Sequence, residues 1–373
     1  MRIAFYAPLK PADHPTPSGD RRIARLLLEA LRGAGHQPFV ASRLRSYDGE
    51  GDEPRQARLA AIGAGTAARL LQRWRREPDA APELWLTYHL YYKAPDWLGP
   101  PISTALGIPY VIAEASHAPK RAGGSWQAGH RAVADALRRA DAVLGLNPAD
   151  RECVLPLLRG PQRWVALPPF LDARRYGARR APPRSPPPGP PRLVAVAMMR
   201  EGDKLASYRQ LGAALARALD LPWSLEVIGD GPARAEVESA LTVLGSRVSY
   251  RGALGEAAVA GALADADLLV WPAINEAFGM ALLEAQASGV AVVAGASGGV
   301  AGIVVPGETG LLAPPGDVAG FAAAVRRLIL DGELRARMGA AARAKVEREH
   351  DLPAAAARLA AVIEPLADRV RAA

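Results

Sequence analysis

The sequence predicts an α/β protein of two domains, each built on a doubly wound parallel sheet, and three observations support this prediction. The chain has 373 residues, which exceeds the size at which a single hydrophobic core stops growing. Short apolar runs that favour strands alternate along it with helical stretches rich in Ala, Leu and Arg, which is the pattern of βαβ units. A proline-rich segment near the middle, residues 181–191, stops both helix and sheet.

Each half of the chain contains six strand candidates, so two six-stranded sheets are expected. In the first half they are Arg2–Ala7, Gln37–Ser42, Leu84–His89, Tyr110–Ala115, Ala142–Leu146 and Trp164–Leu167. In the second half they are Leu193–Met198, Leu225–Ile228, Val248–Tyr250, Leu268–Trp271, Val290–Ala294 and Gly310–Leu312. In doubly wound sheets ligands bind beyond the carboxyl ends of the strands, so functional residues are expected in the loops that follow strands.

The domain boundaries follow from the proline-rich segment. Seven of its eleven residues are proline, which is typical of an interdomain linker. We therefore predict a Rossmann-like domain over residues 1–180 and a second one over residues 192–352. Residues 353–373 are expected to form a helix, with apolar side chains at helical spacing and a kink at Pro365. Two interpretations of this helix are open: it packs back on the first domain, or it is an ordinary terminal helix of the second.

Composition excludes several classes of protein. Half of the residues are apolar and 23% are charged, as in a globular protein with a sizeable core. The longest uncharged run, residues 285–307, has the length of a membrane span but is interrupted by Gly289, Gly295, Gly298, Gly299 and Gly302. The apolar stretch after Arg2 is too short for a signal peptide. A single cysteine, Cys153, excludes an internal disulfide, and no structural zinc motif is present. We expect a cytoplasmic protein.

Positive charge is concentrated in the first half of the chain. Residues 1–185 contain 28 Lys and Arg against 17 Asp and Glu, whereas the remaining residues contain 18 against 21. This excess suggests an anionic partner such as an acidic membrane surface or a phosphorylated acceptor. The alternative is coding composition, because only five of the bases are lysines. No nucleic-acid partner is expected, since no DNA- or RNA-binding motif accompanies the charge.

A candidate anion site follows the predicted strand Leu268–Trp271. A helix is expected to begin near Phe278, and its free backbone N–H groups and dipole suit a diphosphate. Gly279 lets a ligand approach the backbone closely. Glu276 precedes this helix, where its carboxylate can accept hydrogen bonds from sugar hydroxyls, and Glu284 lies inside the helix within reach of a ribose diol. The alternatives are that Glu276 only caps the helix and that Glu284 is a solvated helical residue.

The rest of the second half carries an ordered series of short motifs. They are Met199-Arg200-x3-Lys204, Gly229-Asp-Gly231-Pro232, Val248-Ser-Tyr-Arg-Gly252, the strand that begins at Gly289, Ser297-Gly298-Gly299-Val300 and Gly307-Glu-Thr-Gly310. Together with Glu276-x7-Glu284, this series resembles the donor half of the retaining GT-B glycosyltransferases of family 4, the glycosyl transferases group 1. The resemblance covers nearly all of residues 192–317 and implies two Rossmann-like domains around a central cleft.

The resemblance also implies roles for single residues in the second half. It places Glu276 on hydroxyls of the donor sugar and Glu284 on the nucleotide ribose. It brings the backbone of Phe278-Gly279-Met280 against the sugar and diphosphate, and includes Gly229 among the donor-binding residues. Arg200 and Lys204 correspond to the basic pair that binds the diphosphate.

The basic pair has a physical reason of its own. Cleavage of a sugar–phosphate bond leaves a nucleoside diphosphate with growing negative charge, which fixed cations in a water-poor site stabilise. Arg200 and Lys204 follow a predicted strand, where that charge would develop. The chain departs from the family here, because three residues separate the pair instead of the usual four. The alternative is that both are surface bases at the start of a helix.

The first half resembles the family less closely. The loop after the first strand contains Ser18 and Gly19, which correspond to the family's glycine-bearing loop near the phosphates, although one glycine stands where two are common. His117 follows the fourth strand, where the family often has a histidine that contacts the donor sugar. Glu114, at the end of the same strand, is the second candidate for an acid or base. The alternative for His117 is a structural histidine.

Two clusters of the first half have both a functional and a structural interpretation. The aromatic cluster Tyr88, His89, Tyr91, Tyr92 and Trp97 follows a strand and could line an acceptor pocket or belong to the core. The bases Arg21, Arg22 and Arg25 could attract an anionic acceptor or form a solvated face.

The function expected from these features is transfer of a sugar from a nucleotide-diphosphate sugar to an acceptor. The acceptor would be an envelope polysaccharide, a glycolipid or a small molecule, and the resemblance implies retention at the anomeric carbon. We expect neither a metal nor a cofactor, because no Asp-x-Asp pair suits a divalent cation and the basic pair can replace one. The rivals are a nucleotide-sugar epimerase or phosphorylase of the same fold and a non-catalytic sugar-nucleotide-binding protein.

Overall fold

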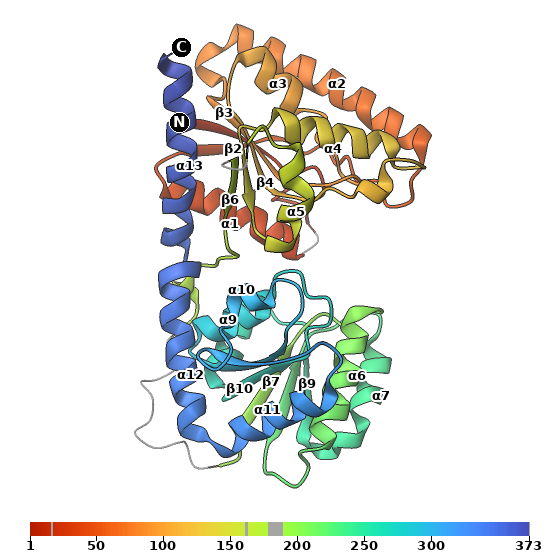
Figure 1. Cartoon of the computed structure of the whole chain (residues 1–373), viewed down its shortest axis with the longest axis vertical. Coiled ribbons are helices and arrows are strands. Elements are labelled where there is room, and N and C mark those ends of the chain that lie inside the picture. The colour runs from red at the N-terminus through yellow and green to blue at the C-terminus, as the bar shows by residue number, and fades with distance from the viewer. Residues whose placement is uncertain (16–17, 161–162, 178–188, 373) are drawn as a thin grey trace. The chain divides into compact units, whose positions relative to one another are not determined.

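The structure is a computed structural model that describes residues 1–15, 18–160, 163–177 and 189–372. It divides into two compact units. The first comprises Met1–Pro168 and Leu352–Ala373, and the second comprises Pro169–Asp351. Each unit contains one parallel sheet of six strands with flanking helices (Figure 1), so the predicted fold class is confirmed.

The sheet of the first unit has the strand order β2-β1-β3-β4-β5-β6, and all its neighbouring strands are parallel. Its strands are β1 (Arg2–Tyr6), β2 (Gln37–Ser42), β3 (Leu84–Leu90), β4 (Tyr110–Ala115), β5 (Ala142–Gly145) and β6 (Trp164–Ala166). Its helices are α1 (Gly19–Gly33), α2 (Glu53–Arg76), α3 (Gly99–Leu106), α4 (Gln127–Arg139), α5 (Arg151–Val154) and α13 (Leu352–Ala372). The chain order reverses between β1 and β3, which is the point where doubly wound sheets bind ligands.

The second unit has the order β12-β11-β10-β7-β8-β9, again with parallel neighbours. Its strands are β7 (Arg192–Val196), β8 (Ser224–Ile228), β9 (Val248–Gly252), β10 (Leu268–Trp271), β11 (Ala291–Gly295) and β12 (Gly310–Ala313). Its helices are α6 (Asp203–Ala216), α7 (Arg234–Leu241), α8 (Glu256–Asp265), α9 (Met280–Ala287), α10 (Val300–Ile303), α11 (Val318–Leu330) and α12 (Gly332–Lys345). Because β7 and β10 pair directly, the loops that follow them lie side by side.

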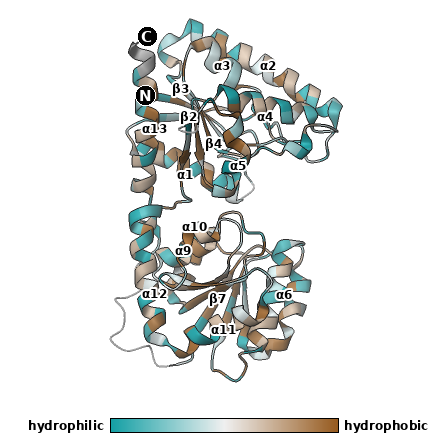
Figure 2. Ribbon diagram, viewed as in Figure 1, coloured by the Kyte–Doolittle hydropathy of each residue, from teal (hydrophilic) through white to brown (hydrophobic). Residues whose placement is uncertain are grey.

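The central strands form the core of each unit. Every residue of β4 and of β10 is buried, and Figure 2 shows strands of both sheets in the brown of hydrophobic residues. Parallel strands covered by helices on both faces need such continuous apolar runs. This explains why the strands could be predicted from apolar runs rather than from an alternating pattern.

Helix α13 lies in the first unit, where it packs against α1. Leu359 and Ile363 of α13 are fully buried, and Ala356 lies against Gly33 at the end of α1. Pro365 stands inside the helix, as the sequence suggested. None of the helices in the described part of the chain is both long and apolar enough to cross a membrane.

The second unit begins before the proline-rich segment. Leu171, Ala173 and Tyr176 are buried in its core, so the compact unit starts at Pro169 rather than at residue 192. Segments 169–173 and 350–351 pair there: Leu171 N donates to His350 O at 2.9 Å, and His350 Nδ1 lies 2.7 Å from Pro169 O. Of the predicted linker, residues 181–188 lie outside the described residues.

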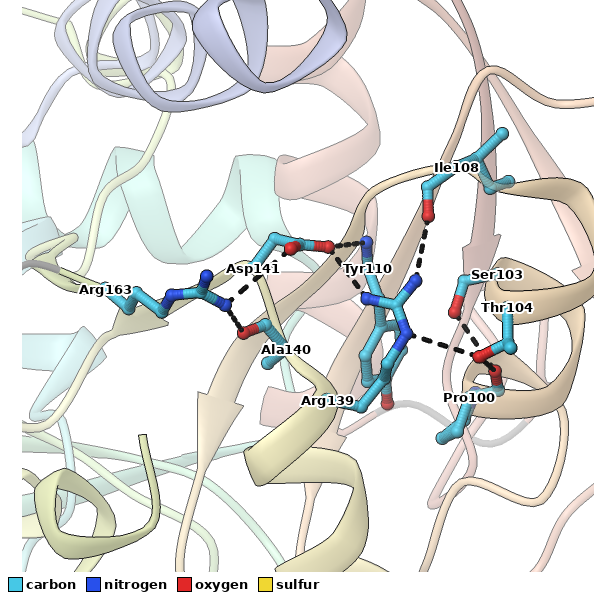
Figure 3. A network of polar contacts seen from close by, with 9 residues as sticks. All are labelled: Pro100, Ser103, Thr104, Ile108, Tyr110, Arg139, Ala140, Asp141 and Arg163. Carbon is cyan, nitrogen blue, oxygen red and sulfur yellow. Dashed lines mark hydrogen bonds and ion pairs between the residues drawn. The ribbon is translucent and has the colours of Figure 1, made fainter. Parts of the chain in front are cut away.

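A polar network of Arg139, Arg163 and Asp141 lies at the amino ends of the strands of the first sheet (Figure 3). The Asp141 Oδ2 atom accepts hydrogen bonds from Tyr110 N and Arg139 Nη1, both at 2.9 Å. Arg163 donates to Ala140 O at 2.6 Å and pairs with Asp141 at 3.6 Å. Part of the positive charge of the first half is therefore structural.

Candidate functional site

The loop between β10 and α9 holds the predicted donor motif in an unusual backbone conformation. Ala273 and Asn275 have φ values of 52° and 49°, in the left-handed region where a residue other than glycine loses about 1–2 kcal/mol. Helix α9 begins at Met280, two residues later than expected, after Gly279 at φ 68°. Phe278 and Met280 are half-buried, and Gly279 is buried.

The structure brings Glu276 and Lys204 together as an ion pair. Lys204 Nζ donates to Glu276 Oε2, and Trp271 Nε1 donates to the same oxygen at 3.3 Å. The Lys204 ammonium also lies 5.5 Å from the centre of the Trp271 ring, within cation–π range. The side chains of Lys204 and Glu276 are 27% and 17% exposed. The pair is therefore protected but open to a ligand.

A set of hydrogen bonds fixes the loop against the start of α6. Asn275 Nδ2 donates to Asp203 Oδ2 at 2.9 Å, and Ile274 N donates to Ser207 Oγ at 3.1 Å. Lys204 lies in the first turn of α6, between these two anchors. These contacts hold Lys204 beside Glu276, and a fixed cation of this kind is what stabilisation of developing negative charge requires.

Gly298 and Gly299 support the same loop from the other side. A Cβ atom at Gly298 would lie 2.0 Å from Glu276 O, and one at Gly299 would lie 2.2 Å from Ala277 O. Gly299 N donates to Glu276 O at 3.1 Å. The glycine pair in the motif thus permits close backbone packing behind Glu276.

Arg200 and Glu284 occupy opposite environments. Arg200 is exposed in the loop between β7 and α6, and its guanidinium has no hydrogen bond or ion pair with any residue that the structure describes. Glu284 is buried in α9, so the interpretation of it as a solvated helical residue is wrong. A buried carboxylate in a helix needs polar partners.

Gly229 packs against the protein's own backbone. A Cβ atom there would lie 1.8 Å from Ala197 O, and one at Gly231 would lie 2.2 Å from Met199 O. Met199 N donates to Asp230 O at 2.9 Å. The Gly229-Asp-Gly231 turn therefore supports the segment that leads into Arg200.

We expect Gly229→Ala to lower the free energy of unfolding by about 3 kcal/mol, because the added methyl group meets a carbonyl and the backbone has φ 147°. Gly107→Ala is the matched control, since Gly107 is left-handed, with φ 65° and ψ 25°, but has nothing within 4 Å of the added atom. It should lose only about 1 kcal/mol. Urea unfolding of both variants measures the difference, and equal losses would contradict the packing role of Gly229.

The first unit places an acid–base cluster at the carboxyl ends of β3 and β4. His89 and Glu114 have φ values of 60° and 61°. They lie opposite each other, because Tyr88 pairs with Ala113 and Leu90 with Ala115. Asp20 in the first turn of α1 reaches them, with its Oδ1 atom 2.9 Å from His89 Nδ1. Sequence reasoning singled out Glu114 but missed Asp20 and its contact with His89.

Burial and charge shift the titration of this cluster. Burial raises the pKa of Glu114 to about 7, an effect that the nearby His89 opposes. Burial alone would lower the pKa of His89, but Glu114, Asp20 and Asp150 outweigh it and the pKa is raised. The pKa of Asp20 is lowered, because His89 and Lys10 outweigh its burial. Asp20 and Glu114 thus favour the protonated form of His89, and the carboxyl group beside it has a pKa of about 7.

The other predicted residues of the first unit have structural contacts. The Oγ atom of Ser18 caps α1 by accepting from Arg21 N at 3.2 Å, and Gly19 is the first residue of that helix. The ring of His117 lies 4.5 Å from that of His130. Burial, with the charges of His130 and Arg138, lowers the pKa of His117.

The arginine run and the aromatic cluster are only partly available to a ligand. Arg21 donates to His14 O at 2.7 Å and Arg25 to Ala12 O at 2.9 Å, so both hold the loop before α1. Tyr88 is fully buried, and Trp97 packs on Gly63 of α2. Tyr92 remains half-buried and contacts Trp126 edge to face.

No metal site is apparent among the described residues, where no three His, Cys, Asp or Glu side chains come together to hold an ion. The sequence Asp265-Ala-Asp267 precedes β10, and Asp267 accepts from Arg192 N at 2.8 Å. Asp267 therefore caps the amino edge of the sheet, away from the strand ends that carry the candidate site.

Comparison with known proteins supports the resemblance to glycosyltransferases that the sequence motifs suggested. Residues 196–345 match the family described as glycosyl transferases group 1. The sulfoquinovosyl transferase SQD2 of Arabidopsis thaliana is 37% identical over 124 residues, which cover 32% of this chain and 24% of that protein. A D-inositol 3-phosphate glycosyltransferase of Geodermatophilus obscurus is 28% identical over 324 residues, 77% of this chain and 67% of that protein.

Two solved structures have the same fold. Sucrose-phosphate synthase from Thermosynechococcus elongatus aligns with a TM-score of 0.70 at 20% identity, over 99% of each chain. Anabaena Alr3699/HepE in complex with UDP aligns with a TM-score of 0.70 at 16% identity, over 100% of each chain. The motifs and the two Rossmann-like sheets agree with these comparisons: residues 196–345 of the chain match the glycosyl transferases group 1 family, and the chain has the GT-B fold.

Proposed function

We propose that the protein transfers a sugar from a nucleotide-diphosphate sugar to a hydroxyl of an acceptor, with retention at the anomeric carbon and without a metal or other cofactor. The observation that carries the proposal is the preorganised pair of Lys204 and Glu276 in the donor motif. A cation and a carboxylate, each held by the surrounding loop, suit a ligand that has a diphosphate at one end and hydroxyl groups at the other. The two relatives are named as transferases, and the Anabaena structure is a complex with UDP.

Each residue of the second unit has a role in this proposal. Lys204 and Arg200 contact the diphosphate, and the amino end of α9 adds backbone N–H groups. Glu276 accepts hydrogen bonds from the sugar, and Glu284 binds the ribose. The Lys204–Glu276 pair must loosen when the donor enters, because the diphosphate competes with the carboxylate for the ammonium.

The acceptor is an envelope polysaccharide, a glycolipid or a small molecule in this proposal. The retaining route is the front-face one, in which the departing phosphate takes the proton from the acceptor hydroxyl.

A screen of UDP- and GDP-sugars for transfer, hydrolysis and epimerisation tests the proposal. Hydrolysis or transfer with the α configuration retained supports it. Epimerised donor or phosphate-dependent glycan cleavage would instead support the rival enzymes of the same fold, and donor binding without turnover would support a non-catalytic protein.

The two glutamates are expected to differ in their effects on nucleotide binding. Glu284→Ala should weaken binding of the free nucleoside diphosphate by about tenfold, because a charged hydrogen bond to the ribose is worth about 1.5–3 kcal/mol. Glu276→Ala should leave that affinity unchanged or raise it, since it releases Lys204 from its ion pair. Titration calorimetry with UDP and GDP measures both effects. Equal losses of affinity in the two variants would refute the division of roles.

The arginines of α2 suggest where a membrane-bound acceptor would be met. Arg55, Arg58, Arg69, Arg75 and Arg76 are exposed along this helix together with the apolar Ile62. A basic helix with an apolar side chain suits a surface of acidic lipids. We therefore place the protein in the cytoplasm, at the inner face of the membrane.

We expect the chain to sediment with vesicles of phosphatidylcholine and phosphatidylglycerol at low salt and to be released at high salt, where screening shortens the reach of charge to about 10 Å or less. Reversing Arg69, Arg75 and Arg76 to Glu should abolish binding. The same three changes made at Arg209, Arg217 and Arg337, which are exposed arginines of the second unit, are the control. If vesicle binding survives the α2 changes, the excess of arginine in the first half reflects coding composition and not membrane binding.

A further inference from the structure

The end of α12 carries a buried base and a buried imidazole that the proposed donor site does not use. The chain passes from α12 into α13 through a π turn, Val346–His350. Lys345, directly before this turn, is 6% exposed, and His350, at its end, is 1% exposed. A lysine is almost never buried to this degree unless its charge is paired. The partners of these two side chains are therefore part of the fold of the second unit.

The Lys345 ammonium has an acceptor for each of its three N–H groups. Its Nζ atom lies 2.6 Å from His350 Nε2 and 3.1 Å from Glu349 Oε2. The third acceptor is Gly302 O, at 3.4 Å. Side chains meet at three or four positions apart on an α-helix, whereas Lys345 and His350 are five positions apart and meet across the π turn. An ammonium is a donor only, so His350 Nε2 is the acceptor.

The other ring nitrogen of His350 is used as well. Its Nδ1 atom lies 2.7 Å from Pro169 O, and a carbonyl oxygen only accepts, so Nδ1 carries the proton. His350 is thus a neutral imidazole in one defined tautomer. Its backbone oxygen also accepts from Leu171 N at 2.9 Å. His350 therefore joins the two segments, 169–171 and 350–351, at which the chain enters and leaves the second unit.

Lys345 connects this junction to the donor loop. Its acceptor Gly302 lies in α10, which begins directly after Gly299. Gly299 N donates to Glu276 O at 3.1 Å, and the close approach of its Cα to this loop leaves no room even for a methyl group. Contacts therefore run from His350 through Lys345 and α10 to the backbone of Glu276.

We propose that Lys345 and His350 are positioning residues for the donor sugar: their contact holds α10 in place, and α10 holds the backbone of Glu276 where its carboxylate meets the sugar. This inference rests on the proposed glycosyl transfer, because it concerns the carboxylate that is assigned there to the sugar. The diphosphate is assigned to Arg200 and Lys204, which lie in another segment, after β7. Loss of the Lys345–His350 contact should therefore affect the sugar end of the donor more than the nucleotide end.

The first test compares a nucleotide sugar with its nucleoside diphosphate. Lys345→Met removes the ammonium and keeps an apolar stem of similar length. Titration calorimetry on the full chain measures binding of UDP-glucose, GDP-mannose, UDP and GDP. We expect the affinity for the nucleotide sugar that binds to fall about fivefold or more, as the loss of one hydrogen bond gives, and that for its nucleoside diphosphate to stay within about twofold. Arg337→Met, at an exposed base of α12, is the control and should change neither affinity.

Variants of His350 separate this contact from general packing. Leucine fills a similar volume but accepts no hydrogen bond, so His350→Leu should weaken the nucleotide sugar as Lys345→Met does. Glutamine offers both a donor and an acceptor, so His350→Gln should recover most of the lost affinity. The double variant of Lys345→Met and His350→Leu should lose no more than either single variant, because both remove one contact. Losses that add, and that extend to UDP and GDP, would indicate a merely structural role.

Two measurements without a ligand test the connection itself. Hydrogen exchange over residues 273–279 and 296–304 should be faster in Lys345→Met than in the unchanged chain, whereas exchange over β8 should stay the same. Nitrogen-15 NMR of the unchanged chain near neutral pH should show a histidine with its proton on Nδ1 and a free acceptor at Nε2. That signal should be missing from His350→Gln, which assigns it to His350.

Several results would overturn the inference. They are full nucleotide-sugar affinity in Lys345→Met, equal losses for the nucleotide sugar and its nucleoside diphosphate, unchanged exchange over residues 296–304, and a proton on Nε2 of His350. Thermal unfolding confirms that each variant is folded under the conditions of the assay. An unchanged chain that binds none of the four ligands would count against the proposed function, and the exchange and NMR results would still decide whether the pair holds α10.

Discussion

Replacing Lys204 by alanine is expected to lower the kcat of sugar transfer by about a hundredfold, while the KM for the donor changes much less. The negative charge on the departing diphosphate is larger in the transition state than in the bound donor, so a cation beside it acts mainly on turnover. The structure adds a reason for the size of the effect. Lys204 is fixed in the first turn of α6 against the Trp271 ring, so its ammonium needs little movement once the diphosphate has taken the place of Glu276.

Two arginine variants complete the test of Lys204. Arg209→Ala is the control, because Arg209 is an exposed base on the same helix, α6, and should keep full activity. Arg200→Ala should also lower kcat, and the double variant with Lys204→Ala should fall short of the product of the two effects, since both cations stabilise one charge. Nearly full turnover by Lys204→Ala would show that another base binds the diphosphate or that the protein does not transfer sugars.

The fold was predictable because its signals are local and repeated. Most strands are short apolar runs, and every strand of the first five in each sheet's chain order is followed by an α-helix, as the crossover between parallel strands usually is. The position of Lys204 near Glu276 has a different origin. The two residues are 72 positions apart, and they meet because β7 and β10 are neighbours in the sheet. Motif spacing identified both residues, but the ion pair between them depends on the sheet order and on the strained loop at Ala273 and Asn275.

The acid–base cluster of the first unit was only half predictable. Glu114 stands at the end of a predicted strand and was singled out, whereas His89 was treated as one member of an aromatic cluster. Their meeting depends on two residues in the left-handed conformation at one register position. Glycine usually marks such a position in a sequence, and neither residue is glycine. The sequence therefore contains no local signal for this turn of the backbone.

Glu114→Gln is expected to stabilise the protein at neutral and alkaline pH, by about 3 kcal/mol at pH 8 relative to the unchanged chain. The pKa of Glu114 rises from 4.5 to about 7 on folding, chiefly because the side chain is buried. A carboxyl group with a raised pKa stabilises the fold fully at a pH below 4.5, and that contribution is lost as the pH rises through about 7. The glutamine side chain stays neutral throughout, so the variant avoids this loss, which amounts to about 1.4 kcal/mol for each tenfold change in the ionisation constant.

Urea unfolding of both proteins at several pH values from about 4.5 to about 8.5 measures this effect. The two free energies of unfolding should be close at pH 4.5, should separate steadily as the pH rises from about 4.5 to about 7, and should differ by a constant amount at higher pH. Glu152→Gln, at an exposed position, should follow the unchanged chain at every pH. A difference between Glu114→Gln and the unchanged chain that stays constant with pH would show that the Glu114 carboxyl group does not titrate near neutrality. A separation near pH 7 would mean that the fold keeps a destabilising charge at the ends of β3 and β4, which is the usual relation between stability and a group retained for binding or catalysis.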